Sequence, residues 1–213
     1  AHVATSIIAT SPVEKQIIKR YFEVDGEKIT VIPIGVDRSV FPPIPTVQAR
    51  QQLQWDITSK IAVYVGRIEW RKGIGTLVQA LANVIKSFPS IQLYIIGGGK
   101  TKATVDQELN EQQRLQFIAE QLGIADHLHF LGAKKQSELH WYYSAADVCV
   151  VPSYYEPFGI VPIEAMACGT PVIAFDRGSR VLGVFGFNGG LFNGIMPEKI
   201  YFSDLKEDSF FTD

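Results

Sequence analysis

The chain has 213 residues, of which 46% are hydrophobic and 20% charged, close to the average for globular domains, which excludes disordered and fibrous classes. Its length allows one sizeable core, or one domain together with a fragment of another. The formal net charge of −2 argues against nucleic acid as a partner and against a diffuse phosphate-binding surface.

Two cysteines and one long apolar stretch indicate in which cellular compartment the protein is expected. Cys149 and Cys168 have neither metal-site spacing nor the number needed for a disulfide framework, so we interpret both as core residues in a reducing compartment. The apolar stretch over residues 159–175 is interrupted by Pro162 and Glu164, which excludes a single membrane-spanning helix. With no charged-then-apolar leader at the start, we expect a soluble, cytoplasmic protein without a transmembrane segment.

The first part of the chain predicts a small unit of two strands and a helix, followed by a linker. A strand is expected over residues 6–10, a helix over 12–22 and a second strand over 28–33. Ser11 suits the N-cap and Pro12 the first position of that helix. Residues 34–45 contain three prolines and no strong periodicity, which is typical of a linker.

A second and longer series of strands and helices follows. Strands are expected over residues 61–65, 91–96, 128–131, 148–151 and 171–175, and helices over 73–88, 106–122, 137–144 and 161–167. The first of these helices is expected to have one apolar face, made of Leu77, Leu81, Val84 and Ile85. Gly123 is expected to close the second helix in the left-handed conformation. This alternation predicts an α/β fold with a Rossmann-like, doubly wound parallel sheet.

The loop at residues 66–73 is the first candidate site, because ligands in open α/β sheets bind beyond the carboxyl ends of the strands. Gly66 permits a sharp turn after the strand. Arg67 and Lys72 lie between a strand end and a helix start, where free backbone N–H groups favour an anion. A guanidinium with a nearby ammonium suits a diphosphate. The alternative is a solvated basic loop that binds no ligand.

The second candidate is the glycine-rich loop at residues 97–101. It is not a P-loop, because Tyr94 stands where that motif requires a glycine. It is not a dinucleotide fingerprint either, because Thr101 and Lys102 replace the last glycine. Two interpretations stay open: a flexible loop, or a loop whose backbone approaches a ribose or a base.

The third candidate, residues 156–172, contains two glutamates. Glu156 follows a strand and belongs to a loop, whereas Glu164 lies one turn into a helix that begins near Val161. A Phe-Gly turn between them allows both carboxylates to face a cleft at the helix N-terminus. Because burying an unpaired carboxylate is costly, Glu164 needs a partner, which sugar or ribose hydroxyls would supply. The alternative is that Glu164 pairs with a buried arginine or caps a helix.

Together these motifs resemble the retaining glycosyltransferases of family four, the glycosyl transferases group 1, of the sucrose-phosphate-synthase-like kind. Residues 156–172 match the family's two spaced glutamates, with Phe-Gly after the first and E-A-M-A-x-G-x-P-V from the second. Residues 66–73 match G-R-x-x-x-x-K-G, and residues 33–41 resemble the linker signature between two domains. The resemblance implies the C-terminal half of a twin-Rossmann (GT-B) enzyme.

The resemblance also implies a role for each motif. Arg67 and Lys72 would hold the donor diphosphate and stabilise its charge as the glycosidic bond breaks, and Glu156 would contact the transferred sugar; these are the implied catalytic residues. Glu164 would bind the donor ribose, and the loops at Gly97-Gly98 and Leu131 would border the base. The implied donor-binding residues are Gly66, Gly97, Gly98, Leu131, Phe158, Gly159, Ile160, Val161 and Glu164. No metal and no cofactor are implied, because the Arg/Lys pair takes the part of a divalent cation.

The implied reaction moves a hexose from a nucleoside diphosphate sugar, with a UDP-sugar favoured over an ADP-sugar, to a small sugar or sugar-phosphate acceptor. Residues 1–44 would be the end of an N-terminal acceptor domain plus the linker, residues 45–177 the nucleotide-sugar-binding domain, and residues 178–213 a divergent tail. With so little of the acceptor domain, we expect the isolated chain to be inactive. The alternative function is a non-catalytic nucleotide-sugar-binding fragment or a degenerate transferase. A nicotinamide-dependent dehydrogenase is disfavoured, because its glycine fingerprint is missing.

Overall fold

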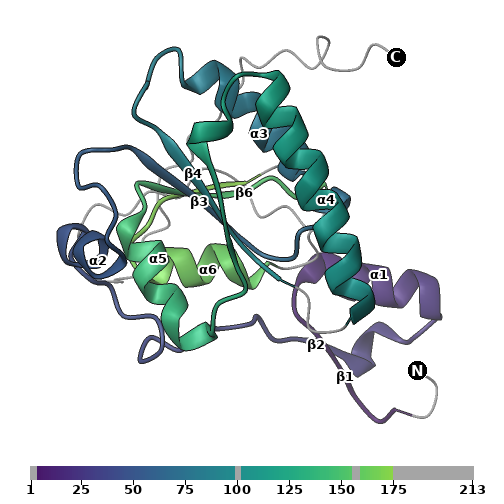
Figure 1. Ribbon diagram of the computed structural model, residues 1–213. Coiled ribbons are helices and arrows are strands. Elements are labelled where there is room, and N and C mark those ends of the chain that lie inside the picture. The colour runs from purple at the N-terminus through teal and green to yellow at the C-terminus, as the bar shows by residue number, and fades with distance from the viewer. Residues whose placement is uncertain (1–3, 99–101, 155–158, 175–213) are drawn as a thin grey trace.

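A computed structural model describes residues 4–98, 102–154 and 159–174. They form two sheets, each made of parallel strands, and the helices that connect these strands (Figure 1). The smaller sheet pairs β1 (Ile7–Ala9) with β2 (Ile29–Val31), and α1 (Pro12–Phe22) connects the two strands. The unit of β1, α1 and β2 lies at one end of the molecule, beside the larger sheet.

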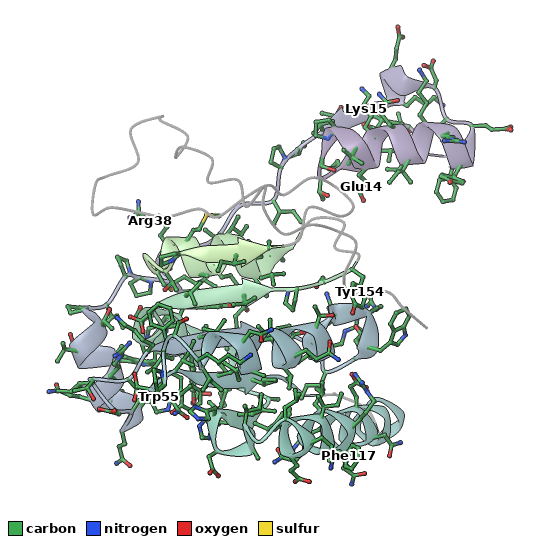
Figure 2. The ribbon with its side chains drawn as sticks, turned by 90° about the horizontal axis from the view of Figure 1, so that it is seen from above. Glu14, Lys15, Arg38, Trp55, Phe117 and Tyr154 are labelled. Carbon is green, nitrogen blue, oxygen red and sulfur yellow. The ribbon has the colours of Figure 1, made fainter. Side chains whose placement is uncertain are left out.

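Polar contacts at the start of α1 hold this small unit together. As predicted, the Ser11 side chain accepts a hydrogen bond from the backbone N–H of Glu14, and Pro12 begins the helix. Lys15 donates a hydrogen bond from Nζ to the carbonyl of Ile29 at 2.7 Å, which ties α1 to β2. Glu14 and Lys15 lie at the same end of the helix (Figure 2).

The larger sheet has five parallel strands in the order β5-β4-β3-β6-β7. Their bounds are β3 Ile61–Val65, β4 Gln92–Ile96, β5 Leu128–Gly132, β6 Val148–Val151 and β7 Val172–Ala174. The chain runs from β3 outward through β4 to β5, and then from β6 outward to β7 on the other side. The predicted doubly wound parallel sheet is therefore confirmed.

Helices cover both faces of this sheet. They are α2 (Thr46–Leu53), α3 (Ile74–Val84), α4 (Lys102–Gln121), α5 (Leu139–Ala145) and α6 (Ile160–Ala167). Ala62 and Tyr64 of β3 are buried in one core with α3 and α4, whereas Ile61 and Val63 are buried in a second core with α5 and α6. Successive strand residues point to opposite faces, so a strand covered on both sides is apolar at almost every position. This explains why β3 was predicted with the bounds that the structure shows.

The helix α2 was not predicted from the sequence. Its buried residues are only Ala49 and Arg50, so it carries no apolar stripe that a periodicity search would detect. Instead, the side chain of Arg50 contacts residues that are distant in sequence. Its Nε donates to the carbonyl of Ala145 at 2.8 Å, and its guanidinium pairs with Asp147 at 2.9 Å. Tertiary contacts of one buried arginine therefore anchor this helix against α5.

The predicted apolar face of α3 was partly wrong. Ile74 and Val78 are fully buried with Leu81, whereas Val84 is 38% exposed and ends the helix. At 100° per residue, Val84 lies about 80° around the helix from Ile74, at the margin of the buried stripe. Leu77 and Ile85 of the predicted face pack against the same core as Leu81, so the prediction was wrong at Val84 and left out Ile74 and Val78.

The helix α4 begins at Lys102, before the predicted start at Asp106, and ends at Gln121. Gly123 has φ +68° and donates its N–H to the carbonyl of Glu120, which confirms the predicted left-handed helix end. Within the described ranges, no helix is long and apolar enough to cross a membrane.

Candidate functional site

The site lies where the winding of the larger sheet reverses direction. β3 and β6 are neighbours, but the chain leaves β3 toward β4 and leaves β6 toward β7. The loops that follow these two strands therefore diverge and open a crevice at their carboxyl ends, the usual ligand position in doubly wound folds. Residues 66–73 after β3, and the described residues 152–154 after β6 and Gly159 before α6, lie at this crevice.

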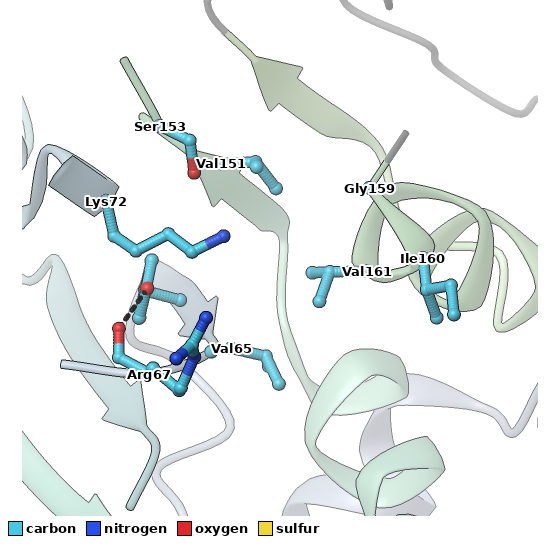
Figure 3. Close-up of a pocket in the computed structure, with 10 residues that line it drawn as sticks. Val65, Arg67, Lys72, Val151, Ser153, Gly159, Ile160 and Val161 are labelled. Atoms are coloured by element: carbon cyan, nitrogen blue, oxygen red, sulfur yellow. Dashed lines mark hydrogen bonds between the residues drawn. The ribbon is translucent and has the colours of Figure 1, made fainter. Parts of the chain in front are cut away.

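A pocket of about 120 Å³ opens at this point (Figure 3). Its lining residues are Tyr64, Val65, Gly66, Arg67, Lys72, Val151, Ser153, Gly159, Ile160 and Val161. The volume is less than the roughly 300–1,000 Å³ of typical small-molecule sites. The pocket by itself therefore has room for only a part of a ligand of that size.

Two cationic side chains from one loop enter the pocket. Figure 3 shows Lys72 and Arg67 directed into the same space, with Ser153 on the side of β6 and Val161 of α6 opposite. The Arg67 side chain is 58% exposed and lies 3.4 Å from Oε1 of Glu69, which Arg71 approaches more closely, at 2.8 Å. Arg67 can therefore turn to an anionic ligand at small cost. The first turn of α6 adds backbone N–H groups without helical partners, which also favour an anion.

Close backbone contacts fix the position of Lys72. The next residue, Gly73, has φ +66°, and a Cβ there would lie 1.9 Å from the carbonyl oxygen of Pro152. The backbone N–H of Tyr154 donates to the carbonyl of Arg71 at 3.0 Å. The loop after β3 is thus attached to the loop after β6, and Lys72 is held close to Ser153.

The glycines Gly97 and Gly98 serve the packing of neighbouring loops. A Cβ on Gly97 would lie 2.0 Å from the carbonyl oxygen of Gly66, and one on Gly98 would lie 2.6 Å from Cβ of Ala133. Neither glycine lines the pocket, and Leu131 packs against the core on the side of α5 and α6. The predicted contacts of Gly97, Gly98 and Leu131 with a base stay predictions.

The carboxylate of Glu164 is buried, with 4% of the residue exposed. Its Oε2 accepts a hydrogen bond of 2.8 Å from the hydroxyl of Tyr143, and its Oε1 one of 3.4 Å from Nε2 of Gln136. The partners in the structure are thus a tyrosine and a glutamine rather than a buried arginine, the alternative considered from the sequence. Burial, with a smaller contribution from the Cys149 thiol and then from Glu164, raises the pKa of Tyr143 well above its usual value, so Tyr143 remains a proton donor.

Comparison with known proteins identifies the family. The family model described as "Glycosyl transferases group 1" matches residues 46–189. The chain belongs to this family. The D-inositol 3-phosphate glycosyltransferase of Segniliparus rotundus is 34% identical over 91% of this chain and 42% of its own length, and that of Corynebacterium jeikeium is 36% identical over 88% and 45%. The chain therefore spans less than half the length of these curated relatives.

Solved structures of GT-B glycosyltransferases have the same fold. Sucrose-phosphate synthase from Thermosynechococcus elongatus is 40% identical, with a TM-score of 0.71, over 82% of this chain and 41% of that chain. Anabaena HepE in complex with UDP and glucose is 27% identical, with a TM-score of 0.73, over 86% of this chain and 49% of that chain. These similarities agree with the resemblance that the sequence motifs indicated.

The structure of this group 1 chain brings together six of the predicted site residues. Gly66, Arg67, Lys72, Gly159, Ile160 and Val161 line the same pocket. Glu164 lies outside the lining, in the core beside α5. Glu156 and Phe158 lie outside the described residues, as do residues 99–101 and the predicted tail. Among the residues that the structure describes, no group of three or more His, Cys, Asp or Glu side chains could hold a metal ion.

Four lining residues were missed by the sequence reasoning: Tyr64, Val65, Val151 and Ser153. A usable signal existed for Ser153, because it follows the predicted strand 148–151 at the carboxyl end where ligands bind. No local signal marked Tyr64, whose hydroxyl donates to the carbonyl of Arg67 at 2.8 Å. That contact fixes the backbone of the loop at residues 66–73 to strand β3.

Proposed function

We propose that the chain supplies the donor-binding domain of a retaining glycosyltransferase, which moves a hexose from a nucleoside diphosphate sugar to a small sugar or sugar-phosphate acceptor. The observation that carries the proposal is the pair of cations, Arg67 and Lys72, directed into a pocket at the reversal point of the sheet. A pocket that holds two cations beside a helix N-terminus suits a diphosphate.

The proposed chemistry places negative charge at this pocket. When the bond between the sugar C1 and the diphosphate oxygen breaks, its electron pair remains on the diphosphate, and the acceptor oxygen forms the new bond to C1. The acceptor proton is transferred to a leaving-group oxygen. Arg67 and Lys72 would stabilise the diphosphate charge as it develops, which is the part that a metal ion takes in other transferases.

The donor is proposed to be a UDP-sugar. HepE, which shares the fold, was solved with UDP-glucose, with UDP, and with UDP and glucose. In this chain Glu164 would bind the ribose, and Glu156, with the backbone of Phe158 to Ile160, would contact the transferred sugar. Gly159, Ile160 and Val161 line the pocket together with the two cations. Residues 45–177 would form this domain.

Calorimetric titration of the 213-residue chain with UDP and UDP-glucose tests the proposal. Charge-assisted hydrogen bonds contribute ~1.5–3 kcal/mol each, so Arg67→Ala and Lys72→Ala should each weaken UDP binding by roughly tenfold or more. Lys60→Ala is the matched control. Lys60 is exposed and lies roughly 20 Å along the strand from Gly66, beyond the screening length. Unchanged UDP affinity in a folded Arg67→Ala variant would falsify the assignment of this loop.

The second candidate function is that of a non-catalytic nucleotide-sugar-binding fragment. The observation that supports it is the small size of the unit β1-α1-β2. Its buried apolar residues are Ala9, Val24 and Ile29, too few to enclose an acceptor. Residues 1–44 would be the end of the acceptor domain, and catalysis requires both reactants to be held together. We therefore expect the chain to bind a donor without turnover. A product assay with UDP-glucose or ADP-glucose, fructose 6-phosphate and other small acceptors checks this, and multiple turnover would contradict it.

A further inference from the structure

The two carboxylate oxygens of Glu164 have different surroundings. The hydrogen bond from Tyr143 to Oε2 is 2.8 Å long and fully buried. The hydrogen bond from Gln136 to Oε1 is 3.4 Å long and only partly buried, which is longer than the roughly 2.7–3.2 Å of a well-formed N–H···O bond. Oε1 is therefore the oxygen that a ligand hydroxyl can reach with the smaller rearrangement.

Tyr143 is itself held rigidly in the core. It is fully buried in the middle of the core between the sheet and helices α5 and α6. The Thr170 hydroxyl donates to its backbone carbonyl at 2.6 Å, and the ring of Phe41 packs against its ring at a centroid distance of 6.2 Å. Its hydroxyl thus has a fixed position from which to hold Oε2 of Glu164.

We infer that Tyr143 is a positioning residue for ribose recognition: it holds one oxygen of Glu164 so that the other is presented to the ribose hydroxyls of the nucleotide. This inference rests on the proposed function, in which Glu164 binds the ribose. The last torsion of a glutamate side chain is broad and weakly restrained. Fixing one oxygen removes that freedom before the ligand arrives, which lowers the entropic cost of binding. Gln136, exposed on the loop after β5, occupies Oε1 through a long bond that a ribose hydroxyl would replace.

The test compares nucleotides with and without ribose hydroxyls. The 213-residue chain is titrated calorimetrically with UDP, ADP and GDP, and the tightest binder is then compared with its 2′,3′-dideoxy form. In the wild type, we expect the ribose form to bind roughly tenfold tighter or more, because a hydrogen bond to a charged group is lost in the dideoxy form. Tyr143→Phe should reduce this preference by about threefold or more, in the range of coupling between contacting residues. The affinity for the dideoxy form should stay the same.

Two further variants separate positioning from a structural effect. In a Glu164→Gln background, Tyr143→Phe should leave the ribose preference unchanged, because its effect acts through Glu164. Ser59→Ala removes a different hydroxyl of a buried residue, one that donates to Asp56 and contacts neither Tyr143 nor Glu164; it should lower stability while keeping the preference.

The outcomes also separate the inference from the proposed function. If the wild type and Glu164→Gln behave as expected but Tyr143→Phe keeps the full ribose preference, the positioning role is overturned while the proposed function stands. If the wild type binds no nucleoside diphosphate, or does not prefer the ribose form, the ribose assignment and the positioning role fail together.

Discussion

The two sides of the candidate site hold their functional groups in opposite ways. On the side proposed for the diphosphate, called the diphosphate side below, Arg67 has a 58% exposed side chain, and the loop that carries it is fixed through its backbone, by Gly73 against Pro152. On the side proposed for the ribose, called the ribose side below, Glu164 is 4% exposed and is fixed through its side chain, by Tyr143.

The difference fits the ligand that is proposed for each group. A diphosphate carries charge that attracts mobile cations from several directions, so a well-placed loop with flexible side chains suffices. A ribose offers neutral hydroxyls whose recognition depends on hydrogen-bond direction, so the acceptor has to be oriented beforehand. We therefore expect the diphosphate side to be sensitive to backbone changes and to salt, and the ribose side to the loss of single hydroxyl groups.

The largest expected effect comes from the backbone of the diphosphate side. Gly73→Ala introduces a Cβ against the carbonyl of Pro152 in a left-handed conformation, and we expect it to lower the free energy of unfolding by about 2–5 kcal/mol. Gly123→Ala is a matched control, because Gly123 has φ +68° but no atom within 4 Å of the added Cβ; only ~1–2 kcal/mol is expected there. Urea-induced unfolding measures both, and equal costs would contradict the loop contact.

The next effect in size separates the two glutamates. Glu164→Gln should weaken UDP and UDP-glucose alike, by roughly tenfold, because both ligands carry the ribose. Glu156→Gln should spare UDP and weaken mainly UDP-glucose, because Glu156 is assigned to the transferred sugar. Calorimetric titration of each variant with both ligands checks this division. An equal loss of UDP affinity in the two variants would show that it is wrong.

A smaller effect is expected from salt. Raising NaCl from about 0.05 to about 0.5 M screens exposed charges, so UDP should bind several-fold more weakly. The ratio of the affinities for UDP and its 2′,3′-dideoxy form should change by less than about twofold, because the buried carboxylate is screened much less. A fall in that ratio comparable to the fall in UDP affinity would mean that the ribose side is as solvent-exposed as the diphosphate side.

The smallest expected effect concerns the thiols of Cys149 and Cys168, which we expect not to react with an alkylating reagent in the native chain. Burial raises the pKa of the Cys168 thiol to about 12 and also raises that of Cys149. Because the thiolate is the reactive form, iodoacetamide at about pH 8 should label neither cysteine in the native chain, and both in urea. Mass spectrometry reads the labelling. Native Tyr143→Phe should also stay unlabelled, and labelling of that variant would reveal a disturbed core.

Local patterns in the sequence determined much of this protein. The strands Ile61–Val65 and Val148–Val151 were predicted with their observed bounds, because strands buried on both faces are short, continuous apolar runs. The Ser11 cap was readable because capping acts over three residues of the chain. The position of the basic loop at the carboxyl end of a strand was also readable, and Arg67 and Lys72 line one pocket there; that this loop binds an anion stays a prediction.

Tertiary structure alone decided how the buried polar groups are paired. The contact between Tyr143 and Glu164 joins residues 21 apart in the sequence, and that between Arg50 and Asp147 joins residues 97 apart. Glu164 could be picked out as needing a partner, but not Tyr143 as that partner, and neither Arg50 nor Asp147 was singled out, because periodicity records only which face of an element is apolar. A hydrogen-bond partner depends on how helices and strands are oriented in space. For this reason the helix at Thr46–Leu53 and the orientation of the Glu164 carboxylate became visible only once α2, α5 and α6 were packed on the sheet.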